Sequence, residues 1–142
     1  PQVLCFELTE TSAVTNLARA DQLMQRLRAL GCGLALDDFG TGLSSLAYLR
    51  SLPISVLKID GSFVRDSGTN QRTESMVRAI AQLAHTMGME TVAEYVETDE
   101  LRMRMASLGV DFGQGYAIGR PTPLLEVLDD LALYEAMAAQ EG

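Results

Sequence analysis

The chain of 142 residues has no long hydrophobic run, and no apolar stretch approaches the ~20 residues that a membrane-spanning helix needs. No positively charged segment followed by an apolar one opens the sequence, so nothing resembles a secretory leader. These absences predict a cytoplasmic protein that makes no direct membrane contact.

Cysteine and histidine are scarce. Cys5 and Cys32 are the two cysteines, and because they form no CxxC pair we expect reduced residues of the core. The single histidine, His85, falls late in an expected helix and is interpreted as a structural residue rather than a metal ligand.

Positive charge is also scarce, since 11 basic residues face 19 acidic ones and the net charge is −8. This balance argues against broad contact with the backbone of a nucleic acid polymer. If a substrate carries phosphate, a few placed groups or metal ions must neutralise its charge.

What the chain does contain is a 47% hydrophobic composition, typical of a single globular α/β domain. Apolar residues at helical spacing alternate with short apolar runs. Helices are expected over 11–30, 44–52 and 70–87, from the cap Thr98 to 108, and from Pro123 onward. The stretch 66–72 is the most linker-like, and it is too short to divide domains.

Each of the short apolar runs leads into a polar or charged group. In chain order these groups are Glu7, the pair Asp37 and Asp38, Lys58, Glu94, and, in a weaker segment with two glycines, Gln114. Functional groups at the C-terminal ends of strands separated by helices are typical of a parallel α/β enzyme whose site lies on one rim.

Side chains alternate between the two faces of a strand. This alternation places Glu7, Asp37, Lys58 and Glu94 on faces with small residues, while large aliphatic residues occupy the opposite faces and are expected to meet the helices. Asp38 has the opposite parity, which we attribute to the start of a glycine-rich turn.

Five strands do not close a (β/α)8 barrel, which typically takes ~250 residues. A smaller open sheet is one possibility. The other is the C-terminal part of a (β/α)8 TIM-like barrel, with about five strands and intervening helices, and an opening strand with no helix before it favours this fold.

The segments that carry these groups closely resemble the EAL-domain family, whose members are cyclic di-GMP phosphodiesterases with a (β/α)8-type barrel. The matching segments are Glu7–Glu10, Leu36–Gly42, Leu57–Val64, Val92–Glu97 and Gly113–Tyr116, followed by Arg120 and Pro121. The resemblance implies that residues 1–142 are a partial EAL domain. The strands that carry the Glu-Ala-Leu motif, with an Asn metal ligand, would lie upstream of Pro1.

The resemblance also implies roles for single residues. Glu7, Asp37, Asp38 and Glu94 would hold two Mg²⁺ or Mn²⁺ ions, and Lys58, Glu94 and Gln114 would be catalytic. Simpler interpretations stand beside these: a turn or helix cap for the Asp pair, a countercharge to Asp37 for Lys58, and a salt-bridged rim carboxylate for Glu94.

A loop is implied as well. Phe39, Gly40, Thr41 and Gly42 match the family's mobile loop, which links substrate binding, the metal site and dimer contacts, and Glu10 matches the residue that anchors it. Glu97 matches an additional acid, although a surface position is an alternative, as is a helix N-terminal acid for Glu10. The chain departs from the usual pattern at Leu43, where Tyr is common, and at Tyr95, where Gly is common.

The function implied for the intact domain is metal-dependent hydrolysis of cyclic di-GMP to linear pGpG, with little or no turnover by residues 1–142 alone. A non-catalytic cyclic di-GMP receptor or scaffold is the main alternative, and a different metal-using barrel of the enolase type is a third. Partners implied are cyclic di-GMP, the upstream half of the domain, attached sensory domains and a second copy of the chain.

Overall fold

The computed structural model describes residues 3–41 and 46–128. One sheet of five parallel strands runs in the order β1-β2-β3-β4-β5, so each strand pairs with the next one along the chain. The strands are β1 (Cys5–Thr9), β2 (Gly33–Phe39), β3 (Val56–Ile59), β4 (Glu90–Ala93) and β5 (Phe112–Gly113). The predicted parallel α/β class is confirmed.

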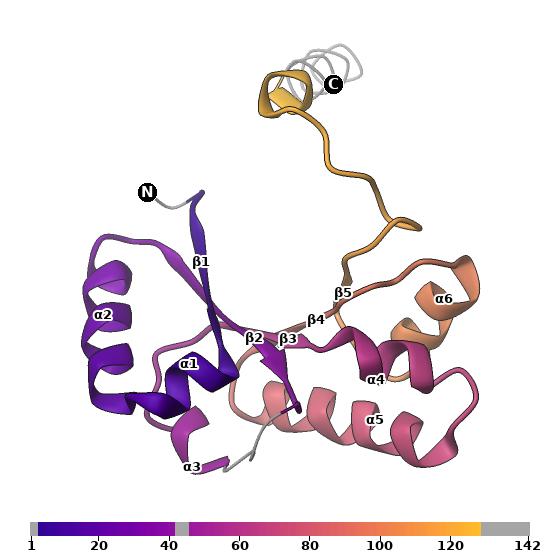
Figure 1. Cartoon of the computed structure of the whole chain (residues 1–142), viewed down its shortest axis with the longest axis horizontal. Coiled ribbons are helices and arrows are strands. Elements are labelled where there is room, and N and C mark those ends of the chain that lie inside the picture. Colours follow the sequence, from indigo (N-terminus) through magenta and orange to yellow (C-terminus); the bar gives the residue numbers. More distant parts are fainter. Residues whose placement is uncertain (1–2, 42–45, 129–142) are drawn as a thin grey trace, which may run out of the picture.

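Helices connect the strands and gather along one side of the sheet, while the chain after β5 leaves on the other side (Figure 1). They are α1 (Glu10–Thr15), α2 (Leu17–Ala29), α3 (Leu46–Leu49), α4 (Gly61–Asp66), α5 (Gln71–Thr86) and α6 (Asp99–Ser107). The expected last helix begins at 124 and is described to 128. No helix within the described ranges is long and apolar enough to cross a bilayer.

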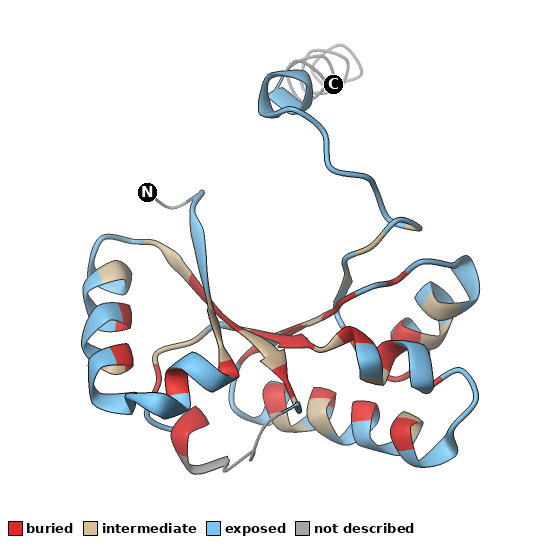
Figure 2. Cartoon of the chain, in the orientation of Figure 1, coloured by how far each residue is buried: buried red, intermediate tan, exposed pale blue. Residues whose placement is uncertain are grey.

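The core lies between the sheet and these helices (Figure 2). Leu36 and Leu57 pack with α2 and α5, and Ile59 packs with α5 and α6, all fully buried. The predicted aliphatic face is therefore confirmed for β2 and β3. On β1 it is confirmed for Leu8, which packs against the core, but Phe6 is 44% exposed on a strand that pairs along one edge only among the described residues.

Two expectations about helices are wrong. The helix expected over 11–30 is divided at Asn16, whose backbone leaves the helical region and whose side chain accepts a hydrogen bond from Arg19 N to begin α2. Helix α4 was not expected at all, because six residues starting at a glycine carry too little periodicity to detect.

The expectation that both cysteines belong to the core is also wrong. Cys5 is exposed on the edge strand β1, and Cys32 is only half-buried in the turn before β2. No disulfide joins them. Their apolar sequence surroundings suggested burial, but burial at an edge depends on what covers the edge.

Candidate active site

A β-bulge brings Asp37 and Asp38 to the same rim. Leu36 pairs with Leu57 and Phe39 pairs with Ile59, so two aspartates on β2 stand opposite the single residue Lys58 on β3. Asp38 adopts φ +56°, a left-handed conformation that Asp tolerates better than most residues. Asp38 therefore does not depart from the alternation of side chains because a turn begins there, as expected. The strand continues to Phe39, and the bulge changes which face of the sheet the following side chains point to.

Lys58 lies at the centre of the site. Its Nζ is 2.8 Å from Glu7 Oε2, 2.8 Å from Glu94 Oε1 and 3.0 Å from Asp37 Oδ1, and its side chain is 5% exposed. Burial by itself would lower the pKa of Lys58, but the contacts with Glu7, Glu94 and Asp37 outweigh it and raise the pKa. The lysine is therefore held as a cation.

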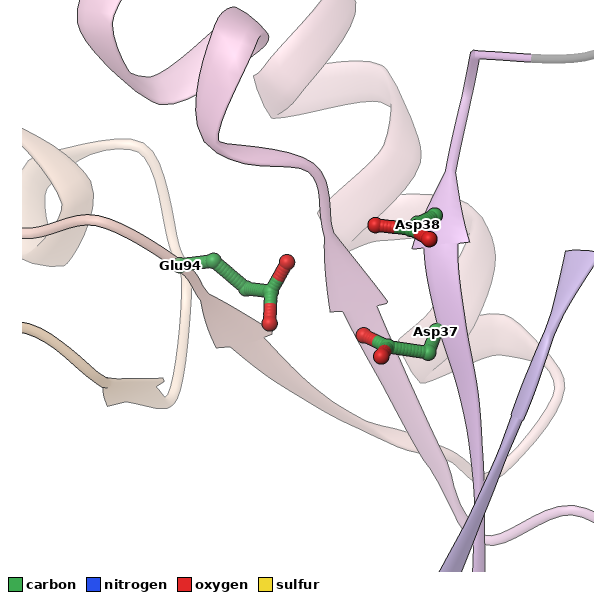
Figure 3. Close-up of side chains that lie close together, drawn as sticks. All are labelled: Asp37, Asp38 and Glu94. Atoms are coloured by element: carbon green, nitrogen blue, oxygen red, sulfur yellow. The ribbon is translucent and has the colours of Figure 1, made fainter.

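Three acids lie close together at this rim (Figure 3). Asp37, Asp38 and Glu94 each offer a carboxylate oxygen, and these oxygens all lie within 4.8 Å of one another. Burial raises the pKa of Glu94, opposed by Lys58 and reinforced by the two aspartates. Burial, Asp37 and Asp60 likewise raise the pKa of Asp38. The site thus concentrates negative charge beyond what Lys58 balances.

One buried carboxylate oxygen in this cluster has no hydrogen-bond donor among the described residues. Asp37 Oδ1 is buried and accepts no hydrogen bond from the described residues, although it faces the Lys58 ammonium at 3.0 Å. The contact with Lys58 therefore supplies opposite charge without hydrogen-bond geometry. A buried carboxylate oxygen without a donor, in a set of hard oxygen ligands, fits a divalent cation such as Mg²⁺ or Mn²⁺.

Glu7 occupies the other side of Lys58. It contacts Lys58 Nζ, its side chain is 47% exposed, and it does not belong to the three-acid cluster. The structure thus brings Glu7, Asp37, Asp38, Lys58 and Glu94 to one rim, with Glu7 on its open side.

Glu97 and Gln114 share a pocket with Glu94. This pocket of about 280 Å³ is lined by Glu94, Tyr95, Glu97, Gln114, Gly115 and Tyr116. Backbone hydrogen bonds from Gln114 N to Ala93 O and from Val96 N to Gln114 O hold its two walls together. Polar and aromatic side chains that line a pocket next to the acids are typical of a site that binds part of a ligand.

The residues of the expected loop take different positions. Gly40 follows the bulge at φ +104°, and the Thr41 hydroxyl donates to Asp38 O. Phe39 is buried on the helix side of the sheet and does not face the acids. Gly42 and Leu43 lie outside the described residues.

Glu10 is buried behind this turn. Its Oε2 accepts a hydrogen bond from Gly40 N at 3.0 Å, and its Oε1 accepts one from the Tyr48 hydroxyl at 2.6 Å. Tyr48, on α3, was not among the candidate residues. A tyrosine between leucines reads as an ordinary core residue, and only the fold shows which carboxylate its hydroxyl meets.

Tyr95 holds a position that usually suits glycine. Its φ is +53°. Its ring packs so closely on Gly61 that a Cβ at position 61 would clash with Tyr95 Cδ2, and the Arg65 guanidinium stacks 4.8 Å from the ring centroid. Glu94 still reaches Lys58, so the tyrosine does not displace the carboxylate.

Comparison with known proteins identifies relatives among the cyclic di-GMP phosphodiesterases. The cyclic di-GMP phosphodiesterase PdeB of Shewanella oneidensis is 47% identical over 141 residues, which is 99% of this chain and 16% of PdeB. PdeF of Escherichia coli, also a cyclic di-GMP phosphodiesterase, is 46% identical over 90% of this chain and 17% of its own length.

A solved structure of the Pseudomonas aeruginosa phosphodiesterase MucR in complex with c-di-GMP superposes with a TM-score of 0.83 at 38% identity. The match covers 89% of this chain and 51% of that one, so the chain spans about half of a barrel-type EAL structure. The sequence profile of the EAL domain matches residues 1–121. The chain therefore belongs to the EAL-domain family.

Proposed function

We propose that this chain is the C-terminal part of an EAL domain that hydrolyses cyclic di-GMP to linear pGpG. The observation that carries the proposal is the convergence of Glu7, Asp37 and Glu94 on Lys58, each within 3.0 Å, from four neighbouring strand ends. A cation buried among acids at the rim of a parallel sheet is the arrangement expected for phosphoryl chemistry.

Asp37, Asp38 and Glu94 would hold divalent cations, with Glu7 as a further ligand from the open side. When bound there, two Mg²⁺ or Mn²⁺ ions would activate a water and neutralise charge on the attacking and leaving oxygens of a phosphodiester. Cyclic di-GMP is the ligand named for MucR, and phosphodiesterase activity is named for PdeB.

The chain's own groups have separable tasks in this proposal. Lys58 stays protonated, so it attracts a phosphate and balances the acids rather than removing a proton. Glu94 contacts Lys58 and lines the pocket, so it is placed to orient a water or accept its proton. Gln114 offers an amide from the far wall of the pocket, and Glu97 a second carboxylate.

We further propose that residues 1–142 form one partial domain, completed by upstream strands that carry the Glu-Ala-Leu segment. Leu4, just before β1, and Phe6, on β1, are 54% and 44% exposed, as expected for a strand whose outer neighbour belongs to another segment. Attached sensory domains, a homodimer and a cytoplasmic location remain predictions.

The test is magnesium-dependent formation of pGpG by the full-length protein and by its Glu94→Gln variant. We expect the variant to lose turnover by at least about a hundredfold while still binding cyclic di-GMP, because the amide keeps the shape and loses the charge. Glu90→Gln is the matched control, since Glu90 lies exposed at the opposite end of the same strand. Unchanged turnover in Glu94→Gln would remove Glu94 from the mechanism.

The second candidate is a receptor that binds cyclic di-GMP without cleaving it. The same experiment separates the two, because a receptor would bind the nucleotide and form no pGpG in the unsubstituted protein. The acids and Lys58 argue against it, since binding alone has no need of so concentrated a set of carboxylates.

A further inference from the structure

One buried hydroxyl group behind the site has no part in the chemistry described so far. Tyr48 lies on α3, is 4% exposed, and sends its hydroxyl to Glu10 rather than to solvent or to the acid cluster. We propose that Tyr48 is a positioning residue for Asp38, which it holds in place through Glu10 and the turn at Gly40. This inference rests on the proposed function, because it assigns Asp38 to the metal site.

The first link joins Tyr48 to Glu10. The Tyr48 hydroxyl donates to Glu10 Oε1 at 2.6 Å, and Glu10 itself is 1% exposed. A carboxylate buried this deeply needs donors on both oxygens, because water cannot supply them. Burial and the contact with Glu10 raise the pKa of Tyr48, so the hydroxyl keeps its proton and remains the donor.

The second link joins Glu10 to the turn. Glu10 Oε2 accepts from Gly40 N at 3.0 Å, and Gly40 lies two residues after Asp38. Gly40 has φ +104°, and a Cβ there would lie 2.8 Å from the Phe63 ring, so the backbone has little freedom to move toward α4. The Glu10 carboxylate fixes the position of this peptide by accepting from its N–H.

The third link returns to Asp38. Thr41 N and the Thr41 hydroxyl both donate to Asp38 O, at 3.4 and 2.9 Å, which closes the turn on the bulge residue. Asp38 is held at φ +56°, an uncommon conformation that persists only where its surroundings enforce it. The turn between Asp38 and Thr41 supplies that constraint, and Glu10 supports the turn.

Removing the Tyr48 hydroxyl therefore has a directed effect. Glu10 Oε1 loses the donor that the described residues give it, so the carboxylate is freer to shift and the Gly40 peptide loses its fixed acceptor. Partners that orient a metal ligand directly change metal affinity by about 10- to 100-fold. Since Tyr48 acts through two intervening groups, we expect about a threefold to tenfold loss.

The experiment compares the full-length protein with Tyr48→Phe, which deletes the hydroxyl and keeps the ring. Two quantities are measured without nucleotide: the affinity for Mn²⁺, and the hydrogen-exchange rate of the Gly40 amide. We expect Tyr48→Phe to weaken Mn²⁺ binding several-fold and to speed Gly40 exchange about tenfold.

Thr91→Val is the matched control. It also deletes a buried hydroxyl that donates to a carboxylate, Asp111, but near the start of β4 and away from the rim. We expect it to leave both quantities unchanged.

Three outcomes overturn the inference: wild-type values of both quantities in Tyr48→Phe, faster Gly40 exchange with unchanged Mn²⁺ affinity, or the same changes in Thr91→Val. Absence of Mn²⁺ binding in the unsubstituted protein would instead overturn the proposed metal site, while Gly40 exchange would still report whether Tyr48 holds the turn.

Discussion

At the scale of single residues, Lys58 determines whether the acids can lie together. Its ammonium lies within 3.0 Å of carboxylate oxygens of Glu7, Asp37 and Glu94. Sequence reasoning identified Lys58 at a strand end and offered two roles, a countercharge and a catalytic group. The geometry shows the countercharge, since one buried cation faces three carboxylates, and the catalytic role stays a proposal.

Lys58→Met tests this charge balance. We expect the free energy of unfolding to fall by about 2 kcal/mol at neutral pH, less than the ~3–5 kcal/mol of a fully buried broken pair, because Glu7 stays half-exposed. Urea unfolding measures the change. Arg102→Met, which breaks an exposed pair with Asp99, should cost below about 0.5 kcal/mol, and a similar loss in both variants would contradict the buried role of Lys58.

Tyr95 shows how one residue can constrain another far away in sequence. Its ring occupies the space that a side chain at position 61 would need. Gly61 itself does not adopt a positive φ, so only this contact, and not the backbone, requires a glycine there.

Gly61→Ala is therefore expected to destabilise the chain by about 1–3 kcal/mol through overpacking. In a Tyr95→Gly background the same substitution should be neutral or stabilising, since alanine is about 1 kcal/mol better than glycine in a helix. A double-mutant cycle by thermal or urea unfolding measures the coupling. Additive effects would show that the ring moves away at no cost.

At the scale of elements, Asp111 joins three pieces of the fold. Asp111 directly precedes β5. Its Oδ2 accepts hydrogen bonds from Thr91 N and from the Thr91 hydroxyl on β4, and lies 2.8 Å from His85 Nε2 on α5. Burial by itself would raise the pKa of Asp111, but the contacts with His85 and Thr91 outweigh it and lower the pKa.

This shift predicts how stability depends on pH. A carboxylate whose pKa is lowered in the folded state stabilises the fold fully at pH values above its pKa in the unfolded chain, which is about 4. That contribution is lost as the pH falls through the pKa of the folded state. We expect Asp111→Asn to be less stable than the unsubstituted chain at pH 6 and to lose less stability on acidification from pH 5 to 2. Asp99→Asn, at an exposed position, should lose as much stability on acidification as the unsubstituted chain. The same loss in all three proteins would contradict the role of Asp111.

Most helices and strands could be predicted because their signals are local. Asn70 and Thr98 cap α5 and α6 at the expected places, and apolar periodicity marks the helix faces. The bulge at Asp38 and the short helix α4 could not, since the first depends on register against β3 and the second on packing against its neighbours.

At the scale of the whole molecule, the sheet of residues 1–142 leaves apolar side chains of its first strand in contact with solvent. We expect the isolated chain to bind divalent ions poorly, to show little or no turnover of cyclic di-GMP and to self-associate through β1. Sedimentation and a pGpG assay, each beside the full-length protein, measure this. Full-rate hydrolysis by the isolated chain would refute it.

The sequence by itself determined the order of the strands and most of the helices, the acids and the lysine at strand ends, and the family, because each depends on residues near one another in the chain. Only the tertiary structure decided that Asp37 and Asp38 face one rim, that Lys58 meets three carboxylates, and that Tyr48 supports Glu10. These features depend on strand register and on contacts between residues as many as 51 positions apart, which no local pattern records.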